Sequence, residues 1–176
     1  MIFAGTALEG AFVIELQPQA DRRGYFARSF CEREFAQQGV AFRALQHNMS
    51  YNHRKGTLRG MHLQRPPHAE AKIVRCTRGA IFDVIVDLRP GSPTRGRWLG
   101  VELTAQNHRS LYVPDGFAHG FQTLCDESEV LYLMDAFYEP SAAAGVRYDD
   151  AQLGIAWPLP VSEISDRDRG LPGFEP

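Results

Sequence analysis

The sequence predicts an all-β protein, a jelly-roll β-barrel with a few short peripheral helices. Two observations carry this prediction. The 16 glycines and 11 prolines are spread along all 176 residues and separate short apolar segments, as in a sheet protein with many turns. These segments are rich in β-branched and aromatic residues, and no long helical pattern comes between them. We therefore expect a roll of strands around a central cavity that accepts one small ligand.

In chain order, the predicted strands are residues 11–16, 24–30, 71–76, 80–88, 98–103, 110–113 and 129–136. One short helix is predicted over residues 31–38, and Gly39 ends it. In the segment 80–88, Asp83 and Asp87 fall on the same strand face, and the apolar residues between them predict burial on at least one face. The turn-rich tail from about residue 149 should wrap the outside as short helices and loops.

Charge and length exclude several classes of protein. The chain has 19 Lys and Arg against 21 Asp and Glu, a net charge of −2 and no basic block, so we expect binding neither to nucleic acid nor to anionic membranes. The most apolar stretch, residues 80–88, is far shorter than the roughly 20 residues of a membrane span. At this length one core is expected, and hence a single domain over residues 1–176.

The N-terminal residues and the cysteines predict a cytoplasmic protein. The first 16 residues lack a basic segment and carry Glu9 and Glu15, which is unlike a signal peptide. Cys31, Cys76 and Cys125 are odd in number and widely spaced, which fits neither a disulfide framework nor a zinc ribbon.

Polar side chains interrupt the strands that should line the roll between residues 45 and 76. Arg59, His62, Gln64 and Lys72 need partners if they are buried there. On one extended strand, Arg59 and His62 point to opposite faces unless a bulge intervenes, whereas His62 and Gln64 share a face. His62 and Lys72 could meet across paired strands. Considered alone, each of these residues also fits a purely structural role: the histidine as a core residue with its hydrogen bonds satisfied, and the lysine and arginine as side chains that reach the surface.

Two further segments carry candidate site residues. His119 lies between glycines in PDGFAHGF, where the backbone can approach a ligand closely. Tyr132 and Tyr138 are six residues apart and would share a face if their strand ran unbroken. Core packing is the alternative for both tyrosines.

A metal site is a further alternative. His62, His68, Glu70 and His119 include the residue types of an iron or zinc site. The spacing argues against it, because His62 is followed by Leu63 and Gln64 instead of forming a His-x-His pair.

Seven segments, in order, resemble the dTDP-4-dehydrorhamnose 3,5-epimerase family: DRRGYF, LRGMHLQ, the lysine of AEAKIVRC, GAIFDVIVDLRPGSPT, VPDGFAHGF, the segment around Tyr132, and GIAWP. The resemblance spans nearly the whole chain. It implies a cupin-type jelly roll, a homodimer with exchanged N-terminal strands, and no metal or other cofactor. The implied substrate is a nucleotide-linked 4-keto-6-deoxy sugar of rhamnose-type biosynthesis, inverted at C3 and usually also at C5.

The resemblance also implies roles for individual residues. His62 resembles the base, Asp168 in the SDRD segment resembles the carboxylate that pairs with it, Lys72 the group that meets the enolate oxygen, and Tyr132 the acid on the opposite ring face. The residues that resemble the family's diphosphate, sugar and base contacts are Arg23, Phe26, Gln46, Asn48, Arg59, His119 and Tyr138.

Three positions depart from the family pattern. Gln19 stands where many dTDP-specific members have phenylalanine, Arg28 replaces an acidic residue, and Leu133 stands where lysine often follows the catalytic tyrosine. The first two departures fall in the nucleotide half of the site, so another nucleotide, or epimerisation at C3 alone, stays open. The alternative functions are those of a metal-dependent cupin oxygenase or isomerase and of a sugar-nucleotide-binding module without turnover.

Overall fold

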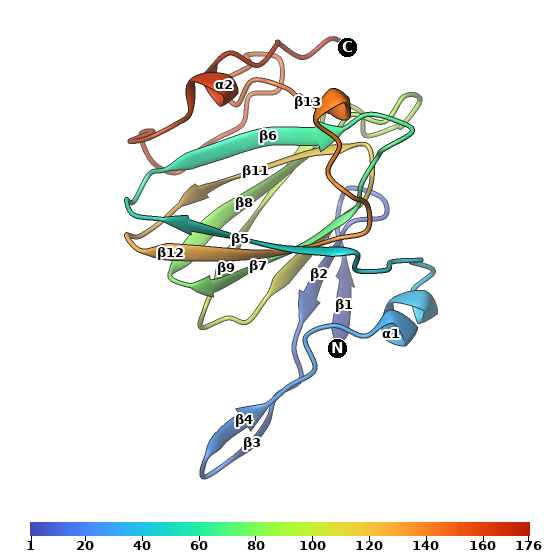
Figure 1. The fold of residues 1–176 in the computed structure, drawn as a ribbon, viewed down its shortest axis with the longest axis vertical. Coiled ribbons are helices and arrows are strands. Elements are labelled where there is room, and N and C mark those ends of the chain that lie inside the picture. Colours follow the sequence, from blue (N-terminus) through green and yellow to red (C-terminus); the bar gives the residue numbers. More distant parts are fainter.

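The computed structural model describes residues 1–176 and consists mainly of two antiparallel sheets (Figure 1). One sheet has six strands, in the spatial order β1 (Ile2–Gly5), β2 (Phe12–Glu15), β10 (Ser110–Val113), β7 (Lys72–Arg78), β12 (Ser128–Met134) and β5 (Gln46–Asn52). The other has five, in the order β13 (Ala143–Gly145), β6 (Leu58–Gln64), β11 (Phe117–Thr123), β8 (Ala80–Asp87) and β9 (Trp98–Thr104). The fold is a cupin-type jelly roll, which confirms the predicted fold class.

Few other elements are present. A hairpin of β3 (Gln19–Asp21) and β4 (Gly24–Phe26) projects away from the two sheets (Figure 1). The helices are short: α1 (Glu32–Gln37), the 3₁₀ turn η1 (Pro140–Ala142) and α2 (Asp166–Arg169). None of these helices has the length and apolar composition of a membrane-spanning segment.

Strand β8 packs against apolar residues on both of its faces. Ile81 and Ile85 belong to the core cluster between the sheets, and Val84 and Val86 belong to a second cluster on the outer face of the five-stranded sheet. All four side chains are completely buried. The strand is therefore buried on both faces, which is why its sequence is almost continuously apolar.

The C-terminal tail covers the outer face of the five-stranded sheet, as its turn-rich sequence predicts (Figure 1). Leu153 packs with Val84 and Val86 there, and the indole N–H of Trp157 donates to the carbonyl of Tyr148 at 2.9 Å. The tail holds α2 against β6, which brings residues far apart in the sequence to one place.

Helix α1 covers the outer face of the six-stranded sheet, and its bounds agree with the prediction to within one residue at each end. The predicted strand 24–30 is wrong at its end, because β4 stops at Phe26. Phe30 instead turns under the helix, where its ring lies 5.3 Å from that of Phe35 and 5.7 Å from that of Phe42. Burial of this aromatic cluster outweighs the local strand propensity.

Candidate active site

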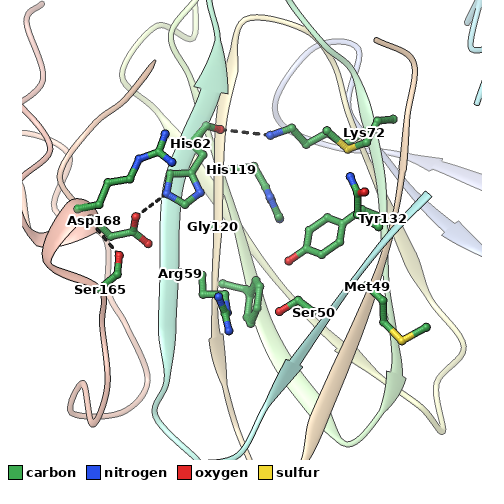
Figure 2. Close-up of a pocket in the computed structure, with 14 residues that line it drawn as sticks. Met49, Ser50, Arg59, His62, Lys72, His119, Gly120, Tyr132, Ser165 and Asp168 are labelled. Atoms are coloured by element: carbon green, nitrogen blue, oxygen red, sulfur yellow. Dashed lines mark hydrogen bonds and ion pairs between the residues drawn. The ribbon is translucent and has the colours of Figure 1, made fainter. Parts of the chain in front are cut away.

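A cavity of about 430 Å³ lies between the two sheets, at the end of the roll next to α2 (Figure 2). Four predicted catalytic residues and three predicted binding residues line it: His62, Lys72, Tyr132 and Asp168, with Asn48, Arg59 and His119. The other lining residues are Met49, Ser50, Gly120, Phe121, Met134, Ser165 and Arg167.

His62 on β6 forms a pair with Asp168 on α2. The Nε2 atom of His62 lies 2.7 Å from Oδ1 of Asp168, and the backbone N–H of Gly60 donates to Oδ2 of the same carboxyl at 3.0 Å. Burial acts to raise the pKa of Asp168, but the hydrogen bonds from His62 and Gly60 outweigh it and hold the pKa below its ordinary value. The ionised carboxylate accepts from Nε2–H, so the lone pair of the neutral ring is on Nδ1.

Asp168 is itself fixed by the start of its helix. Its backbone N–H donates to the Ser165 hydroxyl, the N-cap of α2, at 3.1 Å. This cap fixes the first turn of the short helix, and the bonds of the Asp168 carboxyl to His62 and Gly60 hold the helix against β6.

A register shift in β6 places Arg59 and His62 on the same cavity. His62 pairs with His119 of β11, and Arg59 pairs with Phe121, so three steps along β6 oppose two along β11. On a regular strand these two residues would point to opposite faces, and this register shift is the bulge that brings them to the same face. Glycine is required here, because Gly60 has a φ of 126° and a Cβ atom on it would lie 2.5 Å from the Cα atom of Gly120.

Arg59 is held in place from the six-stranded sheet. Its Nε donates to Oδ1 of Asn52 on β5 at 2.7 Å. The Arg59 side chain lines the cavity, and a planar guanidinium group is suited to binding phosphate oxygens.

Lys72 reaches the cavity by a different route from the one the sequence predicts. His62 and Lys72 do not lie on paired strands, because β6 and β7 belong to different sheets. The Lys72 Nζ atom instead crosses the interior and donates to the His62 carbonyl at 3.5 Å. It also forms an ion pair of 2.8 Å with Glu70, and both side chains are 7% exposed.

Tyr132 projects into the cavity from β12, on the opposite wall from His62 (Figure 2). Burial, together with the nearby Asp83 carboxyl, raises the pKa of the phenol well above its ordinary value, although Arg59 and Ser50 act to lower it. The phenol therefore remains a proton donor at every physiological pH.

A second histidine–carboxylate pair lies beside Tyr132. His119 Nε2 is 2.7 Å from Oδ1 of Asp83, and the His119 and Tyr132 rings meet edge to face with their centroids 6.0 Å apart. Burial raises the pKa of Asp83, an effect that His119 and Lys72 partly offset. Sequence reasoning placed Asp83 only on a strand face; its signal was an aspartate at an inward position of an apolar strand.

A second cavity of about 410 Å³ adjoins the first and shares Asn48, His62 and Lys72 with it. It contains the other two predicted binding residues on the roll, Gln46 and Tyr138. Gln64 also lines it. His62 and Gln64 share a strand face as predicted, because β6 pairs with β13 without a register shift over residues 62–64.

Tyr138 lies beyond the end of its strand. Because β12 ends at Met134, Tyr132 and Tyr138 do not share a strand face. The Tyr138 side chain is 55% exposed at the rim, and its backbone N–H donates to Oε1 of Gln46 at 2.6 Å. Arg167 lines both cavities and was missed by sequence reasoning, although it lies next to Asp168 in the SDRD segment.

Two predicted binding residues lie away from both cavities of their own chain. Arg23 and Phe26 belong to the projecting hairpin (Figure 1), where the Arg23 side chain is 84% exposed and paired with Asp21, and Phe26 is 75% exposed. Gln19 is the cross-strand partner of Phe26 in this hairpin, and Arg28 pairs with Glu34 at 3.0 Å.

The residues considered for a metal site are held apart in separate pairs. His62 pairs with Asp168, His119 with Asp83, and Glu70 with Lys72. The structure brings together no group of three His, Cys, Asp or Glu side chains that could bind a metal ion.

The fold and the cavity define a cupin-type protein in which titratable side chains from both sheets and from α2 line one cavity. The model of the dTDP-4-dehydrorhamnose 3,5-epimerase family matches residues 5–176, and the chain belongs to this family. An epimerase of that name from Methanothermobacter thermautotrophicus is 45% identical over 170 residues, which cover 95% of this chain and 91% of the relative.

Solved structures agree with this assignment. The Bacillus anthracis epimerase, with TDP and pyrophosphate bound, has a TM-score of 0.95 and 41% identity over 98% of this chain and 99% of that chain. The Legionella pneumophila epimerase, in complex with dTDP-4-keto-L-rhamnose, has a TM-score of 0.90 and 34% identity over 99% of both chains. A relative named as a 3-epimerase, from Streptomyces niveus, is 40% identical over 163 residues, 92% of this chain and 78% of the relative.

Proposed function

We propose that the protein epimerises a nucleotide-linked 4-keto-6-deoxy sugar at C3 and C5, as an isomerase of deoxysugar biosynthesis. The observation that carries this proposal is that an imidazole and a phenol face one another across one cavity, with an ammonium group on its wall. The names of the relatives and of the solved structures support the same reaction.

The residues account for the chemistry of inversion. A hydrogen next to the C4 ketone is weakly acidic, so its removal needs a base and a group that stabilises the enolate oxygen. His62 takes the proton through Nδ1 while Asp168 stabilises the imidazolium that forms. Tyr132 donates a proton to the other face of the enolate, which inverts the carbon.

Lys72 stabilises the negative charge that develops on the C4 oxygen. Its side chain lines the cavity and is 7% exposed, so the field of its ammonium group acts in a region of low dielectric constant. Removal of this charge should cost several kcal/mol of transition-state stabilisation.

The rest of the substrate lies along the two cavities. Arg59 binds the diphosphate, Asn48, Gln46 and His119 contact the sugar, and the exposed Tyr138 ring stacks on the nucleotide base. Bound TDP in the Bacillus anthracis relative supports thymidine as the base, and the changes at Gln19 and Arg28 make the base the first feature to test.

The proposed active form is a homodimer with exchanged N-terminal strands, in which the hairpin of one chain supplies Arg23 and Phe26 to its partner's site. Tyr25 and Phe26 are 51% and 75% exposed on this hairpin, and Met49 on edge strand β5 is 65% exposed. Such apolar exposure is typical of a surface that another chain covers. Three free cysteines support a reducing, cytoplasmic location.

Mixing two inactive variants tests the shared site. His62→Ala and Arg23→Ala, unfolded together and refolded, should recover up to about a quarter of the wild-type activity, because mixed dimers contain one site with both native residues. No recovery, or a monomeric protein by light scattering, would contradict the exchange.

The reaction itself is tested by incubating the protein with a panel of 4-keto-6-deoxy sugar nucleotides in D2O and reading the labelled carbons by NMR. We expect label at C3 and C5 of the dTDP sugar; label at C3 alone would define a 3-epimerase. Turnover that a chelator abolishes would favour the metal-dependent alternative. Binding with no exchange in any nucleotide form would favour a binding module.

A further inference from the structure

The ion pair between Glu70 and Lys72 is buried at the boundary between the two cavities. Each side chain is 7% exposed, and the ammonium and carboxylate atoms lie 2.8 Å apart. Lys72 lines both cavities, whereas Glu70 lines only the second cavity, which Tyr138 also lines. The carboxylate therefore contacts the lysine without entering the first cavity, where the reacting carbon would lie.

The other groups around Lys72 do not replace this carboxylate. Asp83 interacts electrostatically with Lys72, but its Oδ1 is hydrogen-bonded to His119, and no hydrogen bond or ion pair joins it to Nζ. Asp168 is engaged by His62 and Gly60. The remaining partner of Nζ is the neutral His62 carbonyl at 3.5 Å.

Besides Lys72, the charged groups on the cavity wall are Arg59 from β6, Arg167 from α2 and the Asp168 carboxylate, which is paired with His62. The other titratable groups that face the interior are His62, His119 and Tyr132. Asp135 accepts a hydrogen bond from the Ala71 N–H at 2.7 Å, and burial raises its pKa, with smaller contributions from Asp115 and Glu70. Glu70 is therefore the only carboxylate in direct contact with the ammonium.

We infer that Glu70 is a positioning residue for the reaction: its carboxylate holds the Lys72 ammonium charged and directed at the cavity wall where the enolate oxygen forms. The inference rests on the proposed function and adds a residue to it. A buried ammonium group without an anionic partner gives up its proton at a lower pH. A neutral amine cannot stabilise an enolate by charge, so loss of Glu70 should matter most in alkaline solution.

Glu70→Gln tests this, because it keeps the size of the side chain and one acceptor oxygen but removes the charge. We expect the alkaline limb of the kcat profile to move toward acid by about one pH unit or more, with kcat at pH 9 reduced about tenfold or more and KM little changed. Glu70→Asp keeps the charge and should restore most of the alkaline activity. Glu102→Gln on the exposed face of β9 is the matched control and should follow the wild-type profile.

A second readout does not depend on turnover. The rate at which acetic anhydride acylates Lys72, followed by mass spectrometry across a pH series, reports the protonation of the amine directly. Its midpoint should fall by about one pH unit in Glu70→Gln and stay at the wild-type value in Glu102→Gln.

Coincident profiles for Glu70→Gln and wild type, in either measurement, would overturn the inference. A uniform loss of kcat at all pH values, with no movement of the limb, would also overturn it, because that result indicates only a structural role. If Glu70→Gln does not fold, the smaller acidward shift expected for Glu70→Asp decides the matter. If the wild-type protein does not epimerise any substrate, the proposed function fails, and acylation still tests the ion pair.

Discussion

His62 and Tyr132 face each other across the first cavity, from two different sheets. His62 lies on β6 of the five-stranded sheet and Tyr132 on β12 of the six-stranded sheet (Figure 2). A sugar ring between them would meet an imidazole on one face and a phenol on the other. Because the two residues belong to separate sheets, the packing of the jelly roll itself sets the two-sided geometry that inversion requires.

His62→Ala should remove the base and lower kcat by about a thousandfold or more. The reason is that no other side chain of the cavity carries a neutral imidazole oriented by Asp168. Steady-state kinetics with an NMR readout measures the effect. His53→Ala is the control, because that side chain is 80% exposed and lies outside both cavities. Wild-type turnover by His62→Ala would contradict the assignment.

Asp168→Asn should lower kcat by about 10- to 100-fold, since the amide no longer stabilises the imidazolium. The pKa of Asp168 is held below its ordinary value, so the carboxylate stays ionised at any pH above about 4. Steady-state kinetics measures the loss, and wild-type turnover by Asp168→Asn would contradict this role of the carboxylate. Asp166→Asn, an exposed acid on the same helix, should behave as wild type.

Asp87→Ala should destabilise the fold by about 3 kcal/mol or more, because it leaves the Arg89 guanidinium without its partner. Asp87 is fully buried and accepts hydrogen bonds from Arg89, Ser92 and Thr94. Asp149→Ala, which breaks an exposed pair with Arg147, should cost less than about 1 kcal/mol. Urea unfolding at pH 7 measures both, and equal losses would refute the distinction.

The same carboxyl predicts a pH dependence of stability. Burial acts to raise the pKa of Asp87, but its hydrogen bonds outweigh burial and hold the pKa well below the ordinary value. A depressed folded-state pKa gives stability that is complete above the unfolded value of about 4 and is lost as the pH falls toward the folded value. Urea midpoints measured from pH 7 to pH 2 should fall more steeply for wild type than for Asp87→Ala. Parallel curves would contradict this.

Cys76 should resist alkylation in the folded protein. Burial raises the pKa of its thiol to about 11, so little thiolate exists at pH 8. Iodoacetamide at pH 8, followed by peptide mass spectrometry, should label Cys76 only after unfolding in guanidinium chloride. Labelling of native Cys76 at the rate of the unfolded chain would show that the core around it is open.

The sequence predicted most of what depends on local pattern. Strand β8 and helix α1 were placed to within a residue or two, because apolar runs and a terminal glycine determine them locally. The resemblance placed His62, Lys72 and Tyr132 in one site, and the structure brings them to one cavity.

Long-range geometry could not be read in the same way. Whether Arg59 shares the cavity with His62 depends on a register shift between β6 and β11, which neither strand reveals alone. Lys72 and His62 meet through sheet packing and not through strand pairing, because β6 and β7 belong to different sheets. Arg23 and Phe26 lie outside the cavities because their hairpin leaves the roll.

The measurement that tests the facing pair most directly is the fate of deuterium in Tyr132→Phe. This variant keeps His62 and loses only the phenol oxygen, so in D2O it should still introduce deuterium next to the ketone of the dTDP-4-keto sugar. Formation of the inverted product should fall by about a hundredfold or more, because the proton then returns from the His62 side. If Tyr132→Phe inverts C3 at the wild-type rate, the proposal that His62 and Tyr132 act on opposite faces of the sugar ring is contradicted.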